Sequence, residues 1–560
     1  MKNLLFKRII SIAAITAMVA SLVACGASDQ SNGSGASSQS TAGEGSVSTV
    51  KDNGPLSKYD PEIEITTVKA VDENVEYAEG ESLENNVWIN GYKEDLGINV
   101  KFLWTSPSTG DQFNQKLNVS IASGDVADIF ACDAQQMASL VDAGLIQDLT
   151  GSYEKYASDL TKKYIDQDPY GFASSKFEGK LMGLPLTGNP VWGASLLWIR
   201  YDWLQKLGLQ EPKTMQDVLA ISEAFTTRDP DGNNKNDTYG LGLTQDLYST
   251  VAGIEGLFDS YHAYPQYWLK DSTENLVYGG IQPEMKNALK TMQDMLKAGQ
   301  LDKEFGTKDM GKVIESITAG KIGMEYGAWW NPDWPLNASK EVDPKAEWRC
   351  YSALSSDDEP ALSGIQNSVW QWYVVSKDCK NPEAAVKMYN YWNEKMFGPN
   401  NENAVFGMGD SGIEEYNQAL VLGWPPDQNF AIYNDFKEAI ETNDDTKVKN
   451  YDMPLFKNIK AFLAGDMSYW GNYVCYEQGR AALVRINDQK SYIFNEFYGV
   501  NTATMTEKFP TLIKMQTEMM TKIILGNPVD EFDAFVANWK KLGGDKITEE
   551  VNAWYAKNKQ

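Results

Sequence analysis

The 560-residue sequence contains only one histidine, His262. Catalytic zinc sites commonly use several histidine ligands, and serine-protease triads need a histidine base. The segment 409–412 (GDSG) has the residues of a protease nucleophile motif, but His262 lies in an unrelated, aromatic-rich context. No His-Glu-x-x-His motif occurs either. The sequence therefore argues against histidine-dependent hydrolysis.

Cysteine is also scarce, with five residues and no Cys-x-x-Cys pair, so no zinc site is indicated. Apart from Cys25, the cysteines are Cys132, Cys350, Cys379 and Cys475. In an exported protein four cysteines allow two disulfides in three pairings, and small buried thiols fit the sequence equally well. The sequence predicts neither arrangement.

Basic residues are outnumbered by acidic ones, 50 to 77, which gives a formal net charge of −27. Nucleic-acid-binding proteins concentrate Lys and Arg on one face, so DNA and RNA are not expected partners. A neutral or cationic ligand suits the negative electrostatic field of the chain better than an anionic ligand does, although a local basic pocket can still hold an anion. Solubility alone explains the charge equally well.

The N-terminal apolar run, residues 9–20, follows Lys2, Lys7 and Arg8, as in a secretory signal peptide. It is shorter than the roughly 20 apolar residues of a membrane span. Leu22-Val23-Ala24-Cys25-Gly26 then looks like the bacterial lipobox. We expect residues 1–24 to be removed and Cys25 to carry fatty acyl chains such as palmitate. A buried or free cysteine near an ordinary cleavage site is the alternative.

Residues 25–57 are rich in Ser, Gly, Ala, Asn and Gln and have few large apolar side chains. Such a segment cannot bury enough surface to offset its chain entropy, so we expect a flexible tether. The protein would then be lipid-anchored at the extracellular face of the cell membrane. The remaining 500 or so residues exceed the usual size of one core, which predicts two or more lobes.

Aromatic residues are abundant, including 17 Trp and 28 Tyr. Most should be core residues, but flat indole faces also suit stacking on sugar rings. Strand-like and helical patterns alternate, which favours parallel α/β sheets. Strands are predicted at 63–68, 98–104 and 128–131, and helices around Trp88 and Tyr92 and at 112–123, 201–207, 214–226, 283–298, 311–319 and 382–395.

Six segments, taken in order, resemble the extracellular solute-binding protein family 1 of ABC importers. They are 128–130 (DIF), 140–149 (LVDAGLIQDL), 179–186 (GKLMGLPL), 197–209 (LWIRYDWLQKLGL), 320–330 (GKIGMEYGAWW) and 374–388 (VVSKDCKNPEAAVKM). The resemblance implies a type II periplasmic-binding-protein-like fold, α/β and bilobal, with two discontinuous lobes joined by a hinge. It also implies a monomer that captures an oligosaccharide by hinge closure and delivers it to ABC permease subunits.

On this resemblance, lobe 1 comprises residues 58–185 and returns at 363–420, lobe 2 comprises 186–362, and 421–560 completes both lobes and the hinge. Ligand contacts are expected first from Trp330 or its neighbour Trp329, at the end of a strand where related proteins stack a sugar. Two adjacent residues of an extended segment point to opposite faces, so only one should meet the ligand. Further candidates are Asn189, Trp192, Trp198, Asp133, Trp370 and Trp372.

Residues 229–240 (DPDGNNKNDTYG) have the spacing of a calcium-binding loop. Side-chain oxygens of Asp229, Asp231, Asn233 and Asp237 fall at positions 1, 3, 5 and 9, and the Lys235 carbonyl at position 7. The glycine is at position 4 instead of 6, and position 12 is Gly240 instead of glutamate. We expect a structural Ca²⁺ ion, with a surface turn as the alternative.

Three other functions remain open at this stage. A lipoprotein glycoside hydrolase needs only a pair of carboxylates at a suitable distance, which a sequence does not display. A binding protein for a peptide or another non-sugar solute would share the same lobes. A purely structural or sensory lipoprotein would share the anchor and tether.

Overall fold

The computed structural model describes residues 54–72, 75–108, 111–407 and 413–558. The predicted signal peptide, Cys25, nearly all of the predicted tether and the 409–412 motif lie outside these residues. None of the described helices is both long enough and apolar enough to cross a membrane.

The first lobe is built on strands β1, β2, β3, β6 and β14. β1 runs parallel to β2, and β14 lies antiparallel between β3 and β6. Thr66 of β1 joins the two groups, because its N–H and hydroxyl both donate to the Asp128 carboxylate, at 2.8 and 2.6 Å. The strands in this lobe are β1 (Ile63–Val71), β2 (Ile98–Pro107), β3 (Ile129–Cys132), β4 (Lys176–Phe177), β5 (Lys180–Leu181), β6 (Leu184–Pro185) and β14 (Trp372–Val375).

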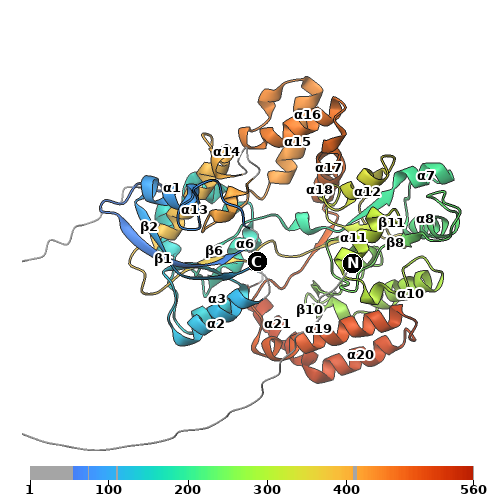
Figure 1. The fold of residues 1–560 in the computed structure, drawn as a ribbon. Helices are drawn as coiled ribbons and strands as arrows, with labels where there is room; N and C mark the ends of the chain where they lie inside the picture. The colour runs from blue at the N-terminus through green and yellow to red at the C-terminus, as the bar shows by residue number, and fades with distance from the viewer. Residues whose placement is uncertain (1–53, 73–74, 109–110, 408–412, 559–560) are drawn as a thin grey trace, which may run out of the picture. The chain divides into compact units, whose positions relative to one another are not determined.

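Alternation along β14 divides the first lobe into three layers. Trp372 and Val374 pack on one face of the sheet, against side chains of α2 and α3, whereas Tyr373 and Val375 pack on the other, with α1 and α13. Figure 1 shows the two helix pairs on opposite faces. The helices are α1 (Val87–Leu96), α2 (Gln112–Ser123), α3 (Ala134–Asp142), α4 (Thr150–Tyr156), α5 (Asp159–Asp166), α6 (Pro169–Ser174), α13 (Glu383–Phe397), α14 (Asn403–Phe406) and η4 (Glu415–Gln418).

The second lobe holds a four-stranded sheet in the order β12-β7-β11-β8. Every residue of the central strand β7 is buried, as its near-continuous apolar sequence predicts. The elements are η1 (Pro190–Gly193), β7 (Leu196–Arg200), α7 (Tyr201–Leu207), α8 (Met215–Thr227), β8 (Tyr239–Leu241), α9 (Glu255–Asp259), β9 (Trp268–Lys270), β10 (Leu276–Tyr278), η2 (Gly279–Ile281), α10 (Glu284–Lys297), η3 (Phe305–Thr307), α11 (Met310–Thr318), β11 (Ile322–Gly327), α12 (Leu336–Val342) and β12 (Trp348–Tyr351).

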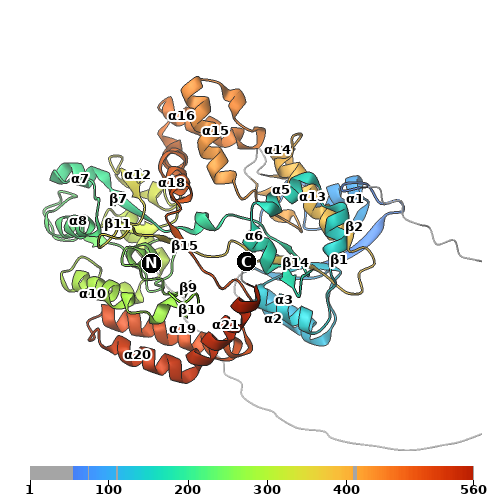
Figure 2. The same ribbon diagram turned by 180° about the vertical axis from the view of Figure 1, so that it is seen from behind.

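Two helical groups follow α14. The first has its own apolar core around Phe436 and Phe456, and the second lies along α10, where Gln293 donates to the Ile523 carbonyl (Figure 2). The elements are α15 (Gln428–Thr442), η5 (Asp445–Lys447), η6 (Asn450–Asp452), α16 (Met453–Leu463), η7 (Met467–Tyr469), α17 (Trp470–Val474), the π-helix η8 (Cys475–Arg480), α18 (Ala481–Gln489), α19 (Ala503–Ile524), α20 (Glu531–Trp539), the π-helix η9 (Lys540–Gly544) and α21 (Asp545–Asn558).

The chain passes between the two sheets after β6 and again before β14. Near the second passage β13 (Ser363–Ile365) pairs in parallel with β15 (Tyr492–Phe494). The buried Asp168 carboxylate accepts hydrogen bonds from the Gly171 N–H and from the Ser368 hydroxyl, at 2.9 and 2.8 Å. At β13, the buried Asp259 accepts from the Gly364 N–H at 3.0 Å. Buried carboxylates thus fasten this hinge segment at both ends.

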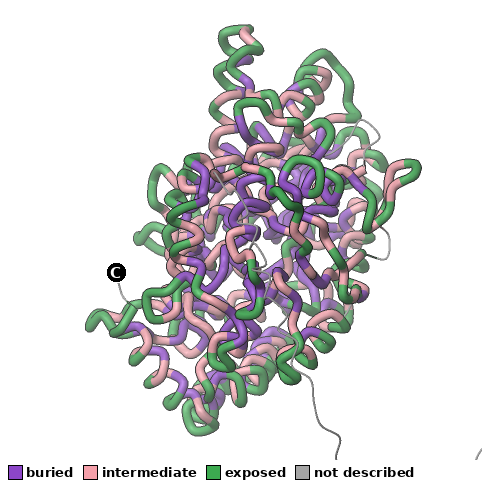
Figure 3. The backbone as a smooth tube through the Cα atoms, turned by 90° about the vertical axis from the view of Figure 1, so that its left-hand side faces the viewer, coloured by how far each residue is buried: buried purple, intermediate pink, exposed green. Residues whose placement is uncertain are grey.

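The predicted elements are confirmed with small shifts at their ends. The prediction of parallel sheets, however, is wrong: both lobes contain antiparallel pairs, because β14 and β7 each pair antiparallel with their neighbours. The helix predicted at 112–123 is α2, that at 201–207 is α7, and that at 214–226 is α8, whose N-cap is Thr214. Figure 3 shows buried segments alternating with exposed ones along the chain, the pattern on which these predictions depend.

One local prediction is wrong. Trp329 and Trp330 are not on an extended segment: β11 ends at Gly327, and both tryptophans lie in a turn that leads to α12. The Asn331 side chain stabilises this turn by donating to the Thr250 carbonyl and to the buried Glu325 carboxylate, at 3.0 and 2.8 Å. Alternation of side chains therefore does not apply there.

Candidate functional site

A cavity of about 840 Å³ lies at the carboxyl ends of the strands of the first lobe. Residues 69–71 form the end of β1, Ser108 follows β2, and Asp133 follows β3. β14 runs antiparallel to β3, so its amino end reaches the same edge and contributes Trp370 and Gln371 to the lining. Ligands of open α/β sheets bind in the crevice outside the carboxyl ends of the strands.

One wall of this cavity is the segment 413–422, which follows α14. Lys69 holds this wall in place, because its Nζ donates to the carbonyls of Asn417 and Ala419 at 2.7 and 2.9 Å. Burial lowers the pKa of Lys69 to about 7. A neutral amine has two N–H donors, which matches the two carbonyls, so this contact does not depend on the positive charge.

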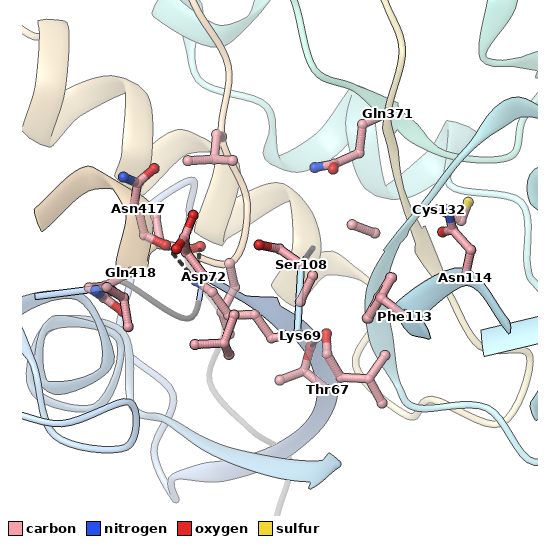
Figure 4. A pocket seen from close by; sticks show the side chains of 18 of the residues that line it. Thr67, Lys69, Asp72, Ser108, Phe113, Asn114, Cys132, Gln371, Asn417 and Gln418 are labelled. Atoms are coloured by element: carbon pink, nitrogen blue, oxygen red, sulfur yellow. Dashed lines mark hydrogen bonds between the residues drawn. The ribbon is translucent and has the colours of Figure 1, made fainter. Parts of the chain in front are cut away.

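The opposite wall comes from α2 and α3, with Phe113 and Asn114 on the first of these helices. Asp133 is the N-cap of α3 and forms a reciprocal capping box with Gln136. The Gln136 amide donates to Asn118 at 3.2 Å and to Asn114 at 3.4 Å. Figure 4 shows Asn417, Gln418 and Asp72 on one side of the cavity and Phe113 and Asn114 on the other.

Trp370 is the most exposed large apolar side chain beside the cavity, with 67% of its surface accessible. Its neighbour Gln371 donates through Nε2 to the Tyr373 hydroxyl at 3.0 Å, which orients the amide. An exposed indole beside several amides offers both the flat apolar face and the paired donors and acceptors that a sugar ring needs.

Of the eight predicted ligand residues, Asp133 and Trp370 line this cavity, and the other six do not. Trp192 and Trp329 pack at the hinge against Ile365 and Leu483. The Trp192 indole N–H is buried without a protein partner. Asn189 is the N-cap of η1, the short helix that contains Trp192.

Trp329 also lies against the guanidinium of Arg480, 4.4 Å from its ring centre. Arg480 is buried and donates through Nε to the Asn429 side chain at 2.9 Å. Trp330 instead stacks on Trp334, with ring centres 6.2 Å apart, and Trp334 is 48% exposed. These rings form a second aromatic group outside the cavity.

Trp198 and Trp372 are core residues. Trp198 has no exposed surface, and its indole N–H donates to the Ala328 carbonyl at 3.0 Å. Trp372 is 4% exposed and packs between the first sheet and helices α2 and α3. Both belong to strands that are buried along their whole length, β7 and β14, because each of these strands is covered on both faces. Neither ring has a face available to a ligand in this structure.

Sequence reasoning missed most of the polar lining, including Lys69, Asp72, Asn114, Gln371 and Asn417. A usable signal existed for Lys69, which directly follows the strand predicted at 63–68, whereas Asp72 follows β1 only because the strand extends to Val71. Asn417 follows no strand, and its place in the wall results from a long-range contact with β1.

The predicted calcium loop begins at Asp229, whose carboxylate accepts the N–H groups of Gly232, Asn233 and Asn234, each at 3.1 Å. Asn234, at position 6, has φ of +60°, the left-handed conformation that calcium loops usually assign to glycine. Asparagine tolerates this conformation better than most residues. The displaced glycine therefore does not prevent the loop from turning.

Three of the five predicted ligands converge. The Asn233 amide contacts Asp231 Oδ2 at 2.6 Å and Asp237 Oδ1 at 3.0 Å. Partial burial and the neighbouring carboxylates of Asp229 and Asp237 raise the pKa of Asp231. Asp237 also pairs with Lys321 at 3.0 Å. Within the described residues, no group of three or more His, Cys, Asp or Glu side chains is arranged to hold a metal ion.

Of the remaining reactive groups, the histidine lies apart from the cavity, whereas the Cys132 thiol is part of its lining. His262 Nε2 is 3.1 Å from Asp357 Oδ1, and neither residue lines the cavity. Of the cysteines, Cys132, Cys350, Cys379 and Cys475 are free thiols, and burial raises the pKa of Cys379 to about 11. Of the two alternatives that the sequence left open, these four residues therefore follow the thiol alternative, with Cys132, Cys379 and Cys475 buried.

Comparison with known proteins places the chain among binding proteins. The family model described as bacterial extracellular solute-binding protein matches residues 76–396. The polygalacturonan/rhamnogalacturonan-binding protein YtcQ of Bacillus subtilis is 23% identical over 450 residues, which cover 78% of this chain and 82% of YtcQ.

Two solved structures share the fold. An HMO-binding solute-binding protein associated with an ABC transporter of Bifidobacterium longum infantis is 18% identical, with a TM-score of 0.62, covering 88% of this chain and 98% of its own. The EF-hand mutant of the Streptococcus pneumoniae substrate-binding protein FusA, in complex with fructo-nystose, is 16% identical, with a TM-score of 0.58, covering 88% and 99%. The predicted bilobal α/β fold is confirmed.

Proposed function

Because the chain belongs to the family of bacterial extracellular solute-binding proteins, we propose that it captures an oligosaccharide and delivers it unchanged to the permease subunits of an ABC importer. The observation that carries this proposal is the cavity at the carboxyl edge of the first sheet, where the exposed Trp370 stands beside amide side chains. The sugars named for YtcQ, for the HMO-binding protein and for FusA are consistent with an oligosaccharide as the ligand class.

In this proposal the first lobe holds the sugar, and closure of the second lobe covers it. We propose the lobe boundaries that the resemblance implies, with residues 58–185 and 363–420 in the first lobe, 186–362 in the second, and 421–560 completing both lobes and the hinge. Trp329, Trp330, Trp192 and Asn189 are the residues proposed to meet the sugar when the lobes close. The buried Trp198 and Trp372 are not part of this site.

The protein is proposed to act as a lipid-anchored monomer at the outer face of the cell membrane. Cys25, directly after the apolar segment, is the acylation site. Several acyl chains would hold the chain at the bilayer, since each buried methylene contributes about 0.8 kcal/mol. Mass spectrometry of the N-terminal peptide tests this point, and an unacylated Cys25 would contradict it.

A structural Ca²⁺ ion is proposed for residues 229–240. The donor set fits this ion, because carboxylate, amide and carbonyl oxygens are its usual ligands and Asn234 already makes the required turn. Asp229, Asp231, Asn233, Asp237 and the Lys235 carbonyl would hold it. A bound cation would offset the repulsion among the three carboxylates and thereby stabilise this corner of the second lobe.

Isothermal titration of the full-length chain in mild detergent, against a panel of oligosaccharides, tests the main proposal. We expect saturable binding of at least one sugar, which chromatography then recovers intact. Recovery of shorter products would indicate a glycoside hydrolase instead. Saturable binding of a peptide, with no response to any sugar, would indicate a different solute.

A further inference from the structure

The lining of the cavity carries an uneven distribution of charge. Among the described lining residues, four side chains are acidic, Asp72, Glu76, Asp133 and Glu414, whereas the one basic side chain is Lys69. Sugar hydroxyls donate well to carboxylates, which accept through two oxygens. A ligand carboxylate would instead face repulsion from these groups.

Lys69 does not offset this repulsion. Its Nζ already donates to two backbone carbonyls of the wall segment 413–422, at 2.7 and 2.9 Å. Binding an anion there would require a charged ammonium in a place where burial favours the neutral amine. It would also compete with the contacts that hold the wall.

The rest of the polar lining comes mainly from amides, those of Asn114, Gln136, Gln371, Asn417 and Gln418, with the hydroxyls of Thr67 and Ser108. Each amide offers both donors and acceptors, which pair with hydroxyl groups of either orientation. Carboxylate recognition in proteins instead relies on Arg or Lys, which bind it through charge-assisted hydrogen bonds.

Arg480, the buried arginine at the hinge, does not supply that recognition either. It is outside the cavity lining, its Nε is bonded to Asn429, and its ring contact is with Trp329. Burial lowers the pKa of Arg480, and the carboxylates of Asp333 and Asp452 act in the opposite direction without reversing this shift. Arg480 is thus held by protein groups outside the cavity.

We infer that, within the proposed oligosaccharide function on which this step rests, the cavity selects uncharged oligosaccharides and rejects those built from uronic acids. Such selectivity would give this chain a different class of ligand from its relative YtcQ, whose name gives polygalacturonan and rhamnogalacturonan as ligands. It follows from the four carboxylates, the engaged lysine and the amide lining of this cavity.

The test compares a neutral oligosaccharide that binds the full-length chain with the same sugar after oxidation of its primary hydroxyls to carboxylates. We expect the oxidised sugar to bind at least about tenfold more weakly, with a smaller difference at high salt, because screening reduces charge repulsion. Equal or tighter binding of the oxidised sugar, or of oligogalacturonate, would overturn the inference but leave the proposed function intact. Failure of every neutral and every acidic oligosaccharide in the panel to bind would overturn both the inference and the proposed function.

A variant without two of the lining carboxylates tests whether these charges cause the weaker binding of the oxidised sugar. The double substitution Asp72→Asn with Glu76→Gln should raise the affinity for the oxidised sugar by about threefold or more. The ratio of the affinities for the neutral and the oxidised sugar should therefore decrease. Asp142→Asn is the matched control, because Asp142 is an exposed acid on α3 that does not line the cavity. If Asp142→Asn decreases the ratio of the two affinities as much as the double variant does, the selectivity does not come from the cavity.

Discussion

Trp370 has 67% of its surface exposed, although indoles are usually buried. It precedes β14 by two residues, where the chain returns to the first sheet, so the backbone at its base is held by strand pairing. Because this backbone is already fixed, less conformational entropy is lost when a ligand stacks on the flat face of the Trp370 ring.

Trp370→Ala should weaken sugar binding by about tenfold, equal to about 1.4 kcal/mol, because the stacking surface is lost. Isothermal titration measures this change. Trp370→Phe is the control, since it keeps an aromatic face and should retain most of the affinity. Because the ring is exposed, neither variant should change the midpoint of thermal unfolding, and equal affinity of Trp370→Ala and the native chain would contradict the assignment.

Lys69 leads to a prediction about pH. Its pKa in the folded chain is about 7, below the ordinary value near 10.5, so between these values the unfolded chain binds the additional proton. Stability from this group therefore increases as pH rises through this window and is constant below it. The free energy of unfolding of the native chain, minus that of Lys69→Met, should increase from pH 6 to pH 9.

Chemical denaturation at several pH values measures this difference. Lys69→Met should also destabilise the chain by about 1–3 kcal/mol, because the carbonyls of Asn417 and Ala419 lose their donor. Lys101→Met on the adjacent strand is the control, since Lys101 is 61% exposed and lies 3.8 Å from an exposed glutamate. If the difference in the free energy of unfolding between the native chain and Lys69→Met does not change with pH, the lowered pKa of Lys69 is contradicted.

At the scale of elements, the loop 229–240 joins α8 to β8, and the hydroxyl of Thr238 fastens it by donating to the Phe225 carbonyl at 2.7 Å. Both flanking elements pack into the core of the second lobe, through residues such as Phe225 and Leu241. An ion bound only to the folded loop would therefore stabilise the whole lobe by mass action.

Calcium should raise the midpoint of thermal unfolding of the native chain, and a chelator should reverse the effect. Asp231→Ala should abolish this response, because Asp231 and Asp237 meet at Asn233. Asp271→Ala is the control: Asp271 caps a turn by accepting from Thr273 and Asn275, and it lies outside the loop. A calcium response that persists in Asp231→Ala would exclude the proposed site.

At the scale of the whole molecule, the hinge segment near β13 connects lobes that have separate cores. Asp168 fastens one side of it through Ser368, and Asp259 fastens the other through Gly364. Such fixed ends confine conformational change to a few intervening residues, which is typical of hinge closure.

Binding of sugar should therefore reduce the radius of gyration measured by small-angle X-ray scattering. Trp370→Ala should need about tenfold more sugar than the native chain to reach the same reduction in the radius of gyration. An unchanged radius in the saturated native chain would contradict closure on the ligand and favour a rigid binding site.

The sequence by itself determined the element order and the fold family, because both depend on local periodicity and on short segments in a preserved order. Thr214 as a helix cap and the helix at 112–123 are examples. It also indicated the calcium-type loop, whose ligands lie within a few residues of one another. Two of the eight predicted ligand residues, Asp133 and Trp370, line the cavity.

Only the tertiary structure decided which tryptophans are core residues and which polar groups meet. Trp198 and Trp370 look alike in sequence, yet one has no exposed surface and the other is 67% exposed, because burial depends on what packs above each strand. The contact of Lys69 with Asn417 joins residues 348 positions apart. No local pattern encodes such pairings, since long-range contacts arise from the packing of whole elements.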